Sequence, residues 1–236
     1  MDQARQLADS GAPEGTLILA DEQTAGRGRL DRRWWSPPGS SLLFSLLFRP
    51  PFSPHQAQRL TMIYSLAVCD AVAAASGLDA RVKWPNDVLI GERKLCGILT
   101  ELELEADKIK YAIVGIGLNI NVDFAQAPPL HAPATSLLAE TGQAFSRQDL
   151  LIVLLRHIEE RYMALLDGRS FHPEWAARMA TIGQPVQVND GQETWHGQAI
   201  GLTPDGALRV RLPDAQIKTV LAGDVTLRQD KGKDND

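Results

Sequence analysis

The stretch SLLFSLLF, at residues 41–48, places the strongest limit on the fold of this chain. Its length suits a β-strand, and its apolar side chains occupy both odd and even positions, so both faces of the strand must be covered. We therefore expect a central strand in a sheet that is covered on both sides. The chain has 236 residues and 44% of them are hydrophobic, which provides a core for one large domain with room for a small second one.

Helices and further strands surround this strand in the sequence. A helix is predicted from Pro54 to Ser76, because Ser53 and Gln56 form a possible capping box and Gly77 follows. The pair Gly91-Glu92 predicts a hairpin between two of the strands. The pattern therefore predicts a domain that combines several helices with several strands. Further helices are expected at 2–10, 146–166 and from Pro173, and further strands at 16–20, 81–84, 88–90, 94–104 and 109–119.

The pattern of the sequence changes near Thr181. Short alternating stretches follow, and turn signals at 189–191, 204–206 and 213–214 interrupt them at the spacing of a small all-β unit. We expect a large domain at 1–181, a small β-domain at 182–228 and a disordered tail at 229–236.

Charge and cysteine content exclude several classes of protein. The 24 Lys and Arg residues against 29 Asp and Glu give a net charge of -5, which disfavours a protein that coats nucleic acid. Cys69 and Cys96 stand in apolar runs and are predicted to be buried thiols of a protein in the reducing cytoplasm. No secretory leader is visible, and the most apolar stretch, residues 60–75, contains Asp70, so no membrane span is expected.

The segment GRGR at residues 26–29, followed by Arg32 and Arg33, is the strongest local signal for a ligand site. Guanidinium groups match phosphates and carboxylates, and glycines let the backbone approach an anion closely. A solvated surface loop or an RNA contact fits the same composition. Of the adjacent Trp34 and Trp35, we expect one in the core and the other at the surface or in a pocket wall.

Three other positions carry chemical groups next to predicted strands. The motif KWPND at 83–87 ends in Asp87, which could hold Mg²⁺ through water, orient a nucleophile or cap a tight turn. Lys94 begins a strand, where most lysines are solvated. Asn119 ends an apolar strand after two glycines, where side chains commonly face a ligand.

The sequence offers no covalent nucleophile and no metal cluster. The five histidines are scattered, and neither a zinc motif nor a G-x-S-x-G motif is present. The predicted chemistry is therefore the handling of phosphate without a covalent enzyme intermediate.

Taken together, four motifs resemble those of the biotin protein ligases. They are DEQTAGRGRLDRRW at 21–34, KWPND at 83–87, RKLCGILTE at 93–101 and GIGLNIN at 115–121, in the order and spacing of that family. The resemblance covers nearly the whole chain. It implies the α+β catalytic fold of biotin and lipoate ligases, with a mixed or antiparallel sheet and flanking helices, which is similar to class II synthetases. A small C-terminal SH3-like β-barrel is expected to follow it.

The resemblance also implies an activity. The expected reaction is the ATP-dependent biotinylation of a lysine on biotin carboxyl carrier protein, through biotinyl-5′-AMP and release of pyrophosphate, with ATP, Mg²⁺ and biotin bound. A lipoate or octanoate ligase or transferase of the same fold is one alternative. A catalytically weakened biotin-binding protein and a nucleic-acid-binding regulator are two others. A monofunctional ligase without a DNA-binding domain implies no DNA or membrane partner, and a homodimer remains open.

Family motifs assign roles to individual residues of this chain. The catalytic residues are expected to be Lys94, Arg29 and Asp87. Biotin contacts are expected from Gln23, Gly26, Arg27, Gly28, Arg29, Lys94 and Gly97, ATP contacts from Arg29, Arg32, Trp34, Lys94 and Asn119, and metal contacts from Asn119 and Asp87.

The start of the sequence departs from the family pattern. Residues 1–4 align with the positions that begin at the asparagine of a D-S-T-N-like motif, so the Ser-Thr pair and the strand before it are missing. We therefore expect weak binding of biotin and an uncovered sheet edge that favours self-association.

Overall fold

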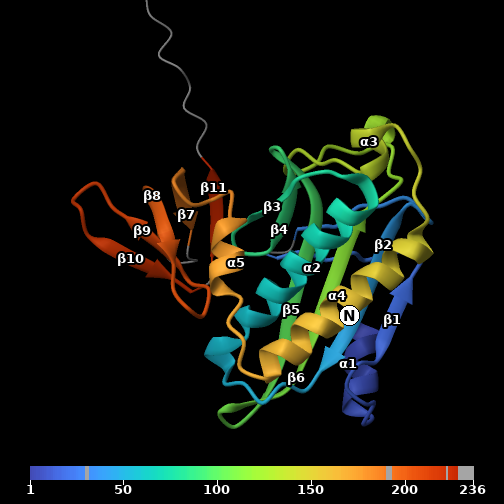
Figure 1. Cartoon of the computed structure of the whole chain (residues 1–236), viewed down its shortest axis with the longest axis horizontal. Helices are drawn as coiled ribbons and strands as arrows, with labels where there is room; N and C mark the ends of the chain where they lie inside the picture. The colour runs from blue at the N-terminus through green and yellow to red at the C-terminus, as the bar shows by residue number, and fades with distance from the viewer. Residues whose placement is uncertain (30–31, 190–192, 222, 228–236) are drawn as a thin grey trace, which may run out of the picture.

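The computed structural model describes residues 1–29, 32–189, 193–221 and 223–227 (Figure 1). The tail expected at 229–236 lies outside the described residues, as do 190–191 of one predicted turn and 30–31 of the arginine-rich segment. The helices are α1 (Asp2–Asp9), α2 (Gln58–Ser76), α3 (Leu137–Thr141), α4 (Arg147–Leu166) and α5 (His172–Ala177), with 3₁₀ turns η1 (Pro54–Gln56) and η2 (Phe124–Gln126). The strands are β1 (Leu17–Ala20), β2 (Ser41–Phe48), β3 (Ala80–Lys83), β4 (Asp87–Ile90), β5 (Arg93–Glu105), β6 (Lys108–Asn119), β7 (Pro185–Asn189), β8 (Thr194–Leu202), β9 (Leu208–Arg211), β10 (Ile217–Val220) and β11 (Asp224–Leu227).

The first six strands form one antiparallel sheet in the order β1-β2-β6-β5-β4-β3. All eight residues of β2 are buried, which confirms the expectation of a strand covered on both sides. The hairpin predicted at Gly91 joins β4 to β5, and Gly91 has the positive φ of 58° that such a turn requires. The α3 helix was not predicted; its cap is Ser136, whose hydroxyl accepts a hydrogen bond from the Ala139 N–H.

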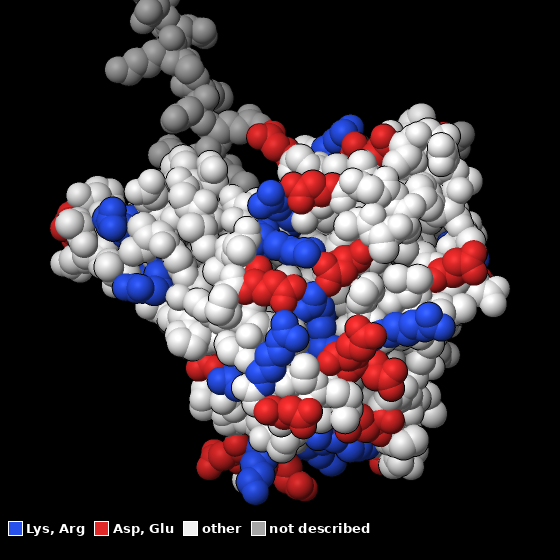
Figure 2. Space-filling model, in the orientation of Figure 1, with Lys and Arg blue, Asp and Glu red and all other residues white. Residues whose placement is uncertain are grey.

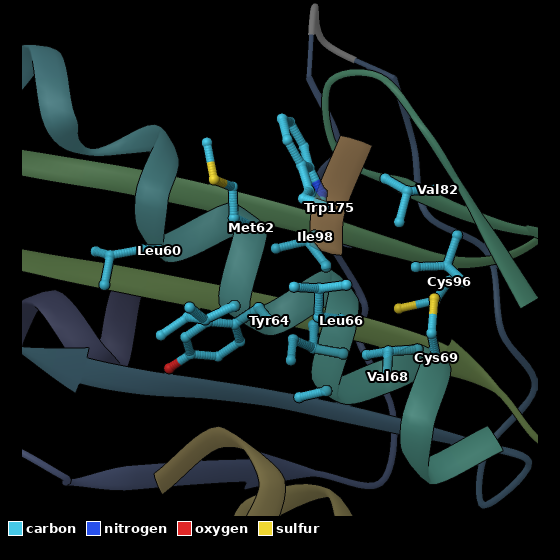
Figure 3. Packing of buried hydrophobic residues seen from close by; sticks show 14 of the residues in the cluster. Leu60, Met62, Tyr64, Leu66, Val68, Cys69, Val82, Cys96, Ile98 and Trp175 are labelled. Carbon is cyan, nitrogen blue, oxygen red and sulfur yellow. The ribbon is translucent and has the colours of Figure 1, made fainter. Parts of the chain in front are cut away.

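One face of this sheet carries the main hydrophobic core. Helices α2 and α4 lie in front of the strands in Figure 1, and α2 packs against the sheet side chains shown in Figure 3. The apolar residues of α2 recur at helical spacing, which by itself predicts one buried face; they include Leu60, Ile63, Ala67, Ala71 and Ala74. Instead, α2 is buried all round from Leu60 to Cys69, because α4 covers the side that points away from the sheet.

The stretch Pro54–Ser76 is long and apolar enough to cross a membrane by length and composition alone. Most of it is buried inside the fold, where it lies between the sheet and α4. A core helix of a folded domain has the same composition, so its hydrophobicity is explained by packing.

The opposite face of the sheet is covered over only part of its length. Ala4 and Ala8 of α1 pack there on Leu47, Tyr111 and Ile113, which form a second, smaller cluster. The residues of β5 and β6 beyond these contacts leave a groove on this face.

The last five strands form a second antiparallel sheet in the order β10-β9-β8-β7-β11, which fits an SH3-like domain. Trp84 of the KWPND motif joins the two sheets. Its indole N–H donates to the Gly206 carbonyl at 2.9 Å, and its backbone N–H donates to the Thr181 hydroxyl at 2.9 Å. The tryptophan of this motif is therefore a buried structural joint, and the motif turns immediately after it through a cis Trp84–Pro85 bond.

The outer surface on the helix side carries charges of both signs (Figure 2). Part of this mixture is an ion-pair network in which Arg161 contacts Asp70 and Glu174, and Arg178 contacts Asp70 at 2.7 Å. The network links α2, α4 and the end of α5. On the side of the molecule that Figure 2 shows, positive and negative side chains alternate, as on an ordinary solvated surface.

Candidate active site

Three glycines form the floor of the groove on the partly covered face. Gly97 of β5 pairs with Gly117 of β6, and Gly115 lies two residues before Gly117 on the same face. A Cβ on Gly117 would lie 2.6 Å from a ring carbon of Trp34, and one on Gly97 would lie 3.0 Å from the same indole. The absence of side chains therefore lets a flat group lie directly on the strands. The cavity above this floor has a volume of about 400 Å³.

Lys94 and Asp87 lie together at one edge of this floor. Lys94 Nζ is 2.6 Å from Asp87 Oδ1 and 5.5 Å from the centre of a Trp34 ring. The backbone of Lys94 is fixed as well, because its N–H donates to the Pro133 carbonyl and its carbonyl accepts from the Thr135 N–H, both at 2.9 Å. The lysine that sequence alone favoured as solvated thus forms an ion pair inside the cavity.

The arginine-rich segment forms a narrow hairpin beside the groove. The Gly28 N–H donates to the Arg32 carbonyl at 2.7 Å, and the Trp34 N–H donates to the Gly26 carbonyl at 3.1 Å. Gly26 has no room for a side chain, since a Cβ there would lie 2.5 Å from the Trp34 carbonyl oxygen. The Arg29 side chain donates to the Gly223 carbonyl at 3.1 Å, so the segment reaches the second sheet.

Arg27 has protein partners in this structure. Its guanidinium donates to the Asp2 carboxylate and lies 4.0 Å from a carboxylate oxygen of Glu101. Gln23, the other residue expected to contact biotin from this part of the chain, lines the cavity next to Gly26.

The two adjacent tryptophans do not divide between core and surface. Both are only partly buried and both line the cavity, which corrects the expectation that one of them belongs to the core. Trp34 lies over Gly97 and Gly117, and Trp35 packs near Phe124 with ring centres 6.1 Å apart. The indole N–H of Trp34 is buried without a hydrogen-bond partner within the described part of the chain.

Asn119 lines the cavity but its amide is already engaged. Its NH₂ group donates to the Thr135 carbonyl at 3.0 Å, its carbonyl oxygen accepts from the Ser41 hydroxyl at 3.5 Å, and the residue is 2% exposed. The amide therefore connects the end of β6 to β2 and to the loop that contains Thr135, at the rim of the groove.

Charge is distributed unevenly around the cavity. Six cationic residues line it, against one carboxylate, Asp87, among the described lining residues. The chain as a whole is negative, so this local excess of positive charge suits a polyanionic ligand. The cationic lining residues are Arg27, Arg29, Arg32, Arg33, Lys83 and Lys94.

Some lining residues were missed by sequence reasoning. Lys83 pairs with Asp87 across β3 and β4, and its place in KWPND was an available signal. His131 lies in the proline-rich loop, and Val225 and Thr226 come from the second sheet; only the folded topology brings these to the groove.

The thiols take no part in chemistry at this site. Burial raises the pKa of the Cys96 thiol far above its usual range, and burial raises that of Cys69 to about 11. Both therefore stay protonated at neutral pH. The described residues also contain no group of three His, Cys, Asp or Glu side chains that could hold a metal ion.

Two sequence profiles match this chain. That of the Biotin/lipoate A/B protein ligase family matches residues 3–119, and that of the Biotin protein ligase C terminal domain matches residues 181–228. The "Biotin--[acetyl-CoA-carboxylase] ligase" of Paracoccus denitrificans is 37% identical over 203 residues, which are 83% of this chain and 84% of that protein.

The "Bifunctional ligase/repressor BirA" of Bacillus spizizenii is 36% identical over 228 residues, which are 95% of this chain and 70% of that protein. The chain belongs to the biotin protein ligase family. A solved structure, "Biotin protein ligase from Aquifex aeolicus in complex with biotin and ATP", covers 96% of this chain and 94% of its own, with a TM-score of 0.79 and 31% identity. Family membership and fold therefore agree over both sheets.

Proposed function

We propose that this protein is a biotin–protein ligase that activates biotin with ATP and transfers it to a lysine of biotin carboxyl carrier protein. One observation carries the proposal: Lys94 and Asp87 stand at the edge of a floor of glycines that admits the flat indole of Trp34 directly onto the strands, beside a hairpin of arginines. The floor suits a flat uncharged ring, and the cations suit the carboxylate and phosphates that must react beside it.

In the first step, the biotin carboxylate attacks the α-phosphorus of ATP. An acyl–phosphate bond forms, the bond to the pyrophosphate leaving group breaks, and biotinyl-5′-AMP remains. The nucleophile is already ionised at neutral pH, so no base is needed. The barrier is the repulsion between an anion and a polyanion, and fixed cations lower it. We assign this role to Lys94 and Arg29.

The other ligand contacts follow from the lining of the cavity. We assign the floor and hairpin positions to biotin and the cationic and indole positions to ATP. The proposed biotin contacts are Gln23, Gly26, Arg27, Gly28, Arg29, Lys94 and Gly97, and the proposed ATP contacts are Arg29, Arg32, Trp34, Lys94 and Asn119.

Mg²⁺ enters this scheme as the complex with ATP. Such an ion is bound largely by phosphate oxygens and water, with one or two protein carboxylates. Asp87 fits this requirement, because its Oδ1 is buried at the cavity and, among the described residues, is compensated only by Lys94. Asn119, the second residue expected at the metal, has its amide engaged by Thr135 and Ser41 and fits it poorly.

In the second step, the carrier lysine attacks the acyl carbon of the adenylate, and AMP leaves. A lysine amine has a pKa near 10.4, so roughly one in two thousand is deprotonated at pH 7. Asp87 is the carboxylate of the cavity lining, and we assign it to accept or orient the proton that the amine loses.

The remaining expectations concern partners and location. β1 is an edge strand of the first sheet, and Leu17 and Leu19 on it are exposed, which supports self-association as a homodimer. Sedimentation over a range of concentrations tests this. The negative net charge supports the absence of DNA binding, and the two buried free thiols support a cytoplasmic location.

The decisive experiment supplies MgATP, a carrier domain and either biotin, lipoate or octanoate. We expect transfer of biotin alone, read by a streptavidin blot and by the mass of the carrier, together with release of one pyrophosphate. Transfer of lipoate or octanoate would favour the alternative ligases of the same fold. Binding of biotin without pyrophosphate release would indicate a binding protein.

A further inference from the structure

Four charged side chains meet where α1, β5 and the arginine hairpin come together. Arg5 of α1 donates to Glu101 Oε2 at 2.9 Å, and this hydrogen bond raises the pKa of Arg5. Asp2, also on α1, accepts from Arg27, and Arg27 Nη2 lies 4.0 Å from Glu101 Oε1. The four side chains form a row of alternating charge, Arg5, Glu101, Arg27 and Asp2. Each contact in this row joins two different elements: α1 to β5, β5 to the hairpin, and the hairpin to α1.

Glu101 is the least exposed acid of the cluster. Its side chain is 23% exposed, whereas that of Asp2 is 74% exposed. It stands four residues after Gly97 on β5, at a position whose side chain points to the same face as the groove floor. The hydrogen bond of Arg27 goes to the exposed Asp2, and Glu101 adds an ion pair at 4.0 Å from a more buried position, where solvent screens its charge less than that of Asp2.

We propose that Glu101 is a positioning residue, which acts through Arg27 to hold the arginine hairpin across the groove. The hairpin is then fastened at two points, to Glu101 and α1 through Arg27 and to the Gly223 carbonyl of the second sheet through Arg29. The proposal rests on the proposed ligase function only for its kinetic consequence. A hairpin held in this way keeps the Gly28 and Arg29 groups near the ligands and keeps water from the adenylate.

A purely structural role for Glu101 makes a different prediction. In that case Glu101 fixes α1 through Arg5, and its loss loosens α1 but leaves the hairpin unchanged. The variant Arg5→Gln removes the link to α1 and keeps the Glu101 charge beside Arg27, so the two roles can be separated.

The first test measures hydrogen exchange in the ligand-free protein by mass spectrometry of peptides that cover residues 23–35. We expect Glu101→Gln to speed exchange of this segment about fivefold. Glu103→Gln is the matched control, because it makes the same change two residues further along β5, and its electrostatic interaction within this cluster of described residues is with Arg5 of α1 and not with Arg27. Exchange in Glu103→Gln should equal that of the parent.

The double variant decides whether Glu101 acts through Arg27. Arg27→Gln alone should speed exchange of the segment, and Glu101→Gln added to it should change exchange by less than twofold more. Arg5→Gln should speed exchange in α1 more than in the hairpin. Equal hairpin exchange in the parent and in Glu101→Gln would overturn the proposal, as would independent effects of the two substitutions in the double variant.

The second test uses the reaction. We expect Glu101→Gln to raise the KM for biotin about fivefold with kcat within twofold of the parent, because Arg27 belongs to the proposed biotin contacts, while the melting temperature stays close to that of Glu103→Gln. A fall in kcat with an unchanged KM would contradict a role in holding the hairpin. Hydrogen exchange needs no activity, so a parent protein without ligase activity would refute the proposed function and leave the first test of Glu101 intact.

Discussion

The two faces of the six-stranded sheet are built from alternating residues of the same strands, yet one face forms the hydrophobic core and the other forms the ligand cavity. Ile98 and Cys96 of β5 face α2 in a closed apolar core, while their neighbour Gly97 faces the groove and leaves space for a ligand. The helix face supplies the stability of the domain, and the groove face places its charges and bare backbone around a cavity. Stability and binding should therefore be separable by the position of a residue along one strand.

The largest expected effect concerns the helix face. Leu66 of α2 is 0% exposed among the core side chains and lies outside the cavity lining, so Leu66→Ala should lower the free energy of unfolding by about 2–5 kcal/mol through lost burial and the cavity left behind. Urea unfolding followed by circular dichroism measures this. The biotin affinity of the folded variant, measured by calorimetry, should stay within threefold of the parent. A large loss of affinity with little loss of stability would show that the two faces of the sheet do not separate stability from binding.

Lys94→Ala tests the groove face. Loss of the cation beside the reacting carboxylate and phosphate should slow adenylate formation about 100-fold, or about 2.7 kcal/mol. The free energy of unfolding should change by less than about 1 kcal/mol, because the side chain is partly exposed and packs on little apolar surface. Pyrophosphate release measures the first quantity. Lys110→Ala, an exposed lysine on β6, is the control, and a rate for Lys94→Ala within twofold of the parent would refute the catalytic role.

The sequence was sufficient to predict most of the fold. The doubly apolar run at 41–48 predicted a strand covered on both sides, and the cap at Ser146 predicted the start of α4, where its hydroxyl accepts from the Asp149 N–H. The sequence did not predict that α2 is buried on all sides. Helical spacing shows which face meets the sheet, but it does not show that α4 packs against the opposite face.

The site was less predictable than the fold. Motif spacing indicated Lys94 and Asp87 as site residues, but their ion pair depends on the pairing of β4 with β5. Trp84 illustrates the limit, because it lines the cavity together with the rest of its motif and also contacts the second sheet, and only the first of these had a signal in the sequence. Contacts between distant segments, such as Arg29 with Gly223, have no local signal in the sequence.

The pH dependence of the free energy of unfolding tests whether the Cys69 thiol is buried in the core on the helix face. Burial raises the pKa of the Cys69 thiol from 9.0 to about 11, so the folded state favours the protonated form. This contribution is fully present below pH 9 and is lost as the pH rises from about 9 to about 11, by roughly 2–3 kcal/mol in total. Parent and Cys69→Ala should therefore differ most in the slope of unfolding free energy across that range. Parallel slopes would show that the thiol is not buried in this way.

Gly117→Ala examines the floor of the groove. The added Cβ would lie 2.6 Å from a Trp34 ring carbon, so either the indole or a bound ring must move. We expect about tenfold weaker binding of biotin by calorimetry, with a change of less than about 1 kcal/mol in stability. Val114→Ala on the same strand faces the helices and should show the reverse pattern, with lower stability and unchanged affinity. Equal affinities in parent and Gly117→Ala would mean that the ligand does not lie on this floor.

The smallest predicted effect separates the two half-reactions at Asp87. The change Asp87→Asn keeps the shape of the side chain and removes its charge, so Lys94 loses its ion-pair partner but keeps its own charge. Adenylate formation uses an anionic nucleophile and needs no base, so it should slow only through a weaker hold on MgATP, and by less than the transfer step does. Transfer from preformed biotinyl-5′-AMP to the carrier lysine requires a proton to leave the amine, and it should slow about fivefold at pH 7.

The pH dependence of Asp87→Asn distinguishes a base from a structural carboxylate. At pH 9 a lysine with a pKa near 10.4 is deprotonated about a hundred times more often than at pH 7, so the amine depends less on a protein base. The transfer defect of Asp87→Asn should then shrink toward the parent rate in single-turnover measurements. A carboxylate that only orders the site, or that holds the metal of MgATP, would instead give a defect of the same size at both pH values and in both half-reactions. Glu103→Gln, whose carboxylate lies outside the cavity lining, controls for the change in net charge.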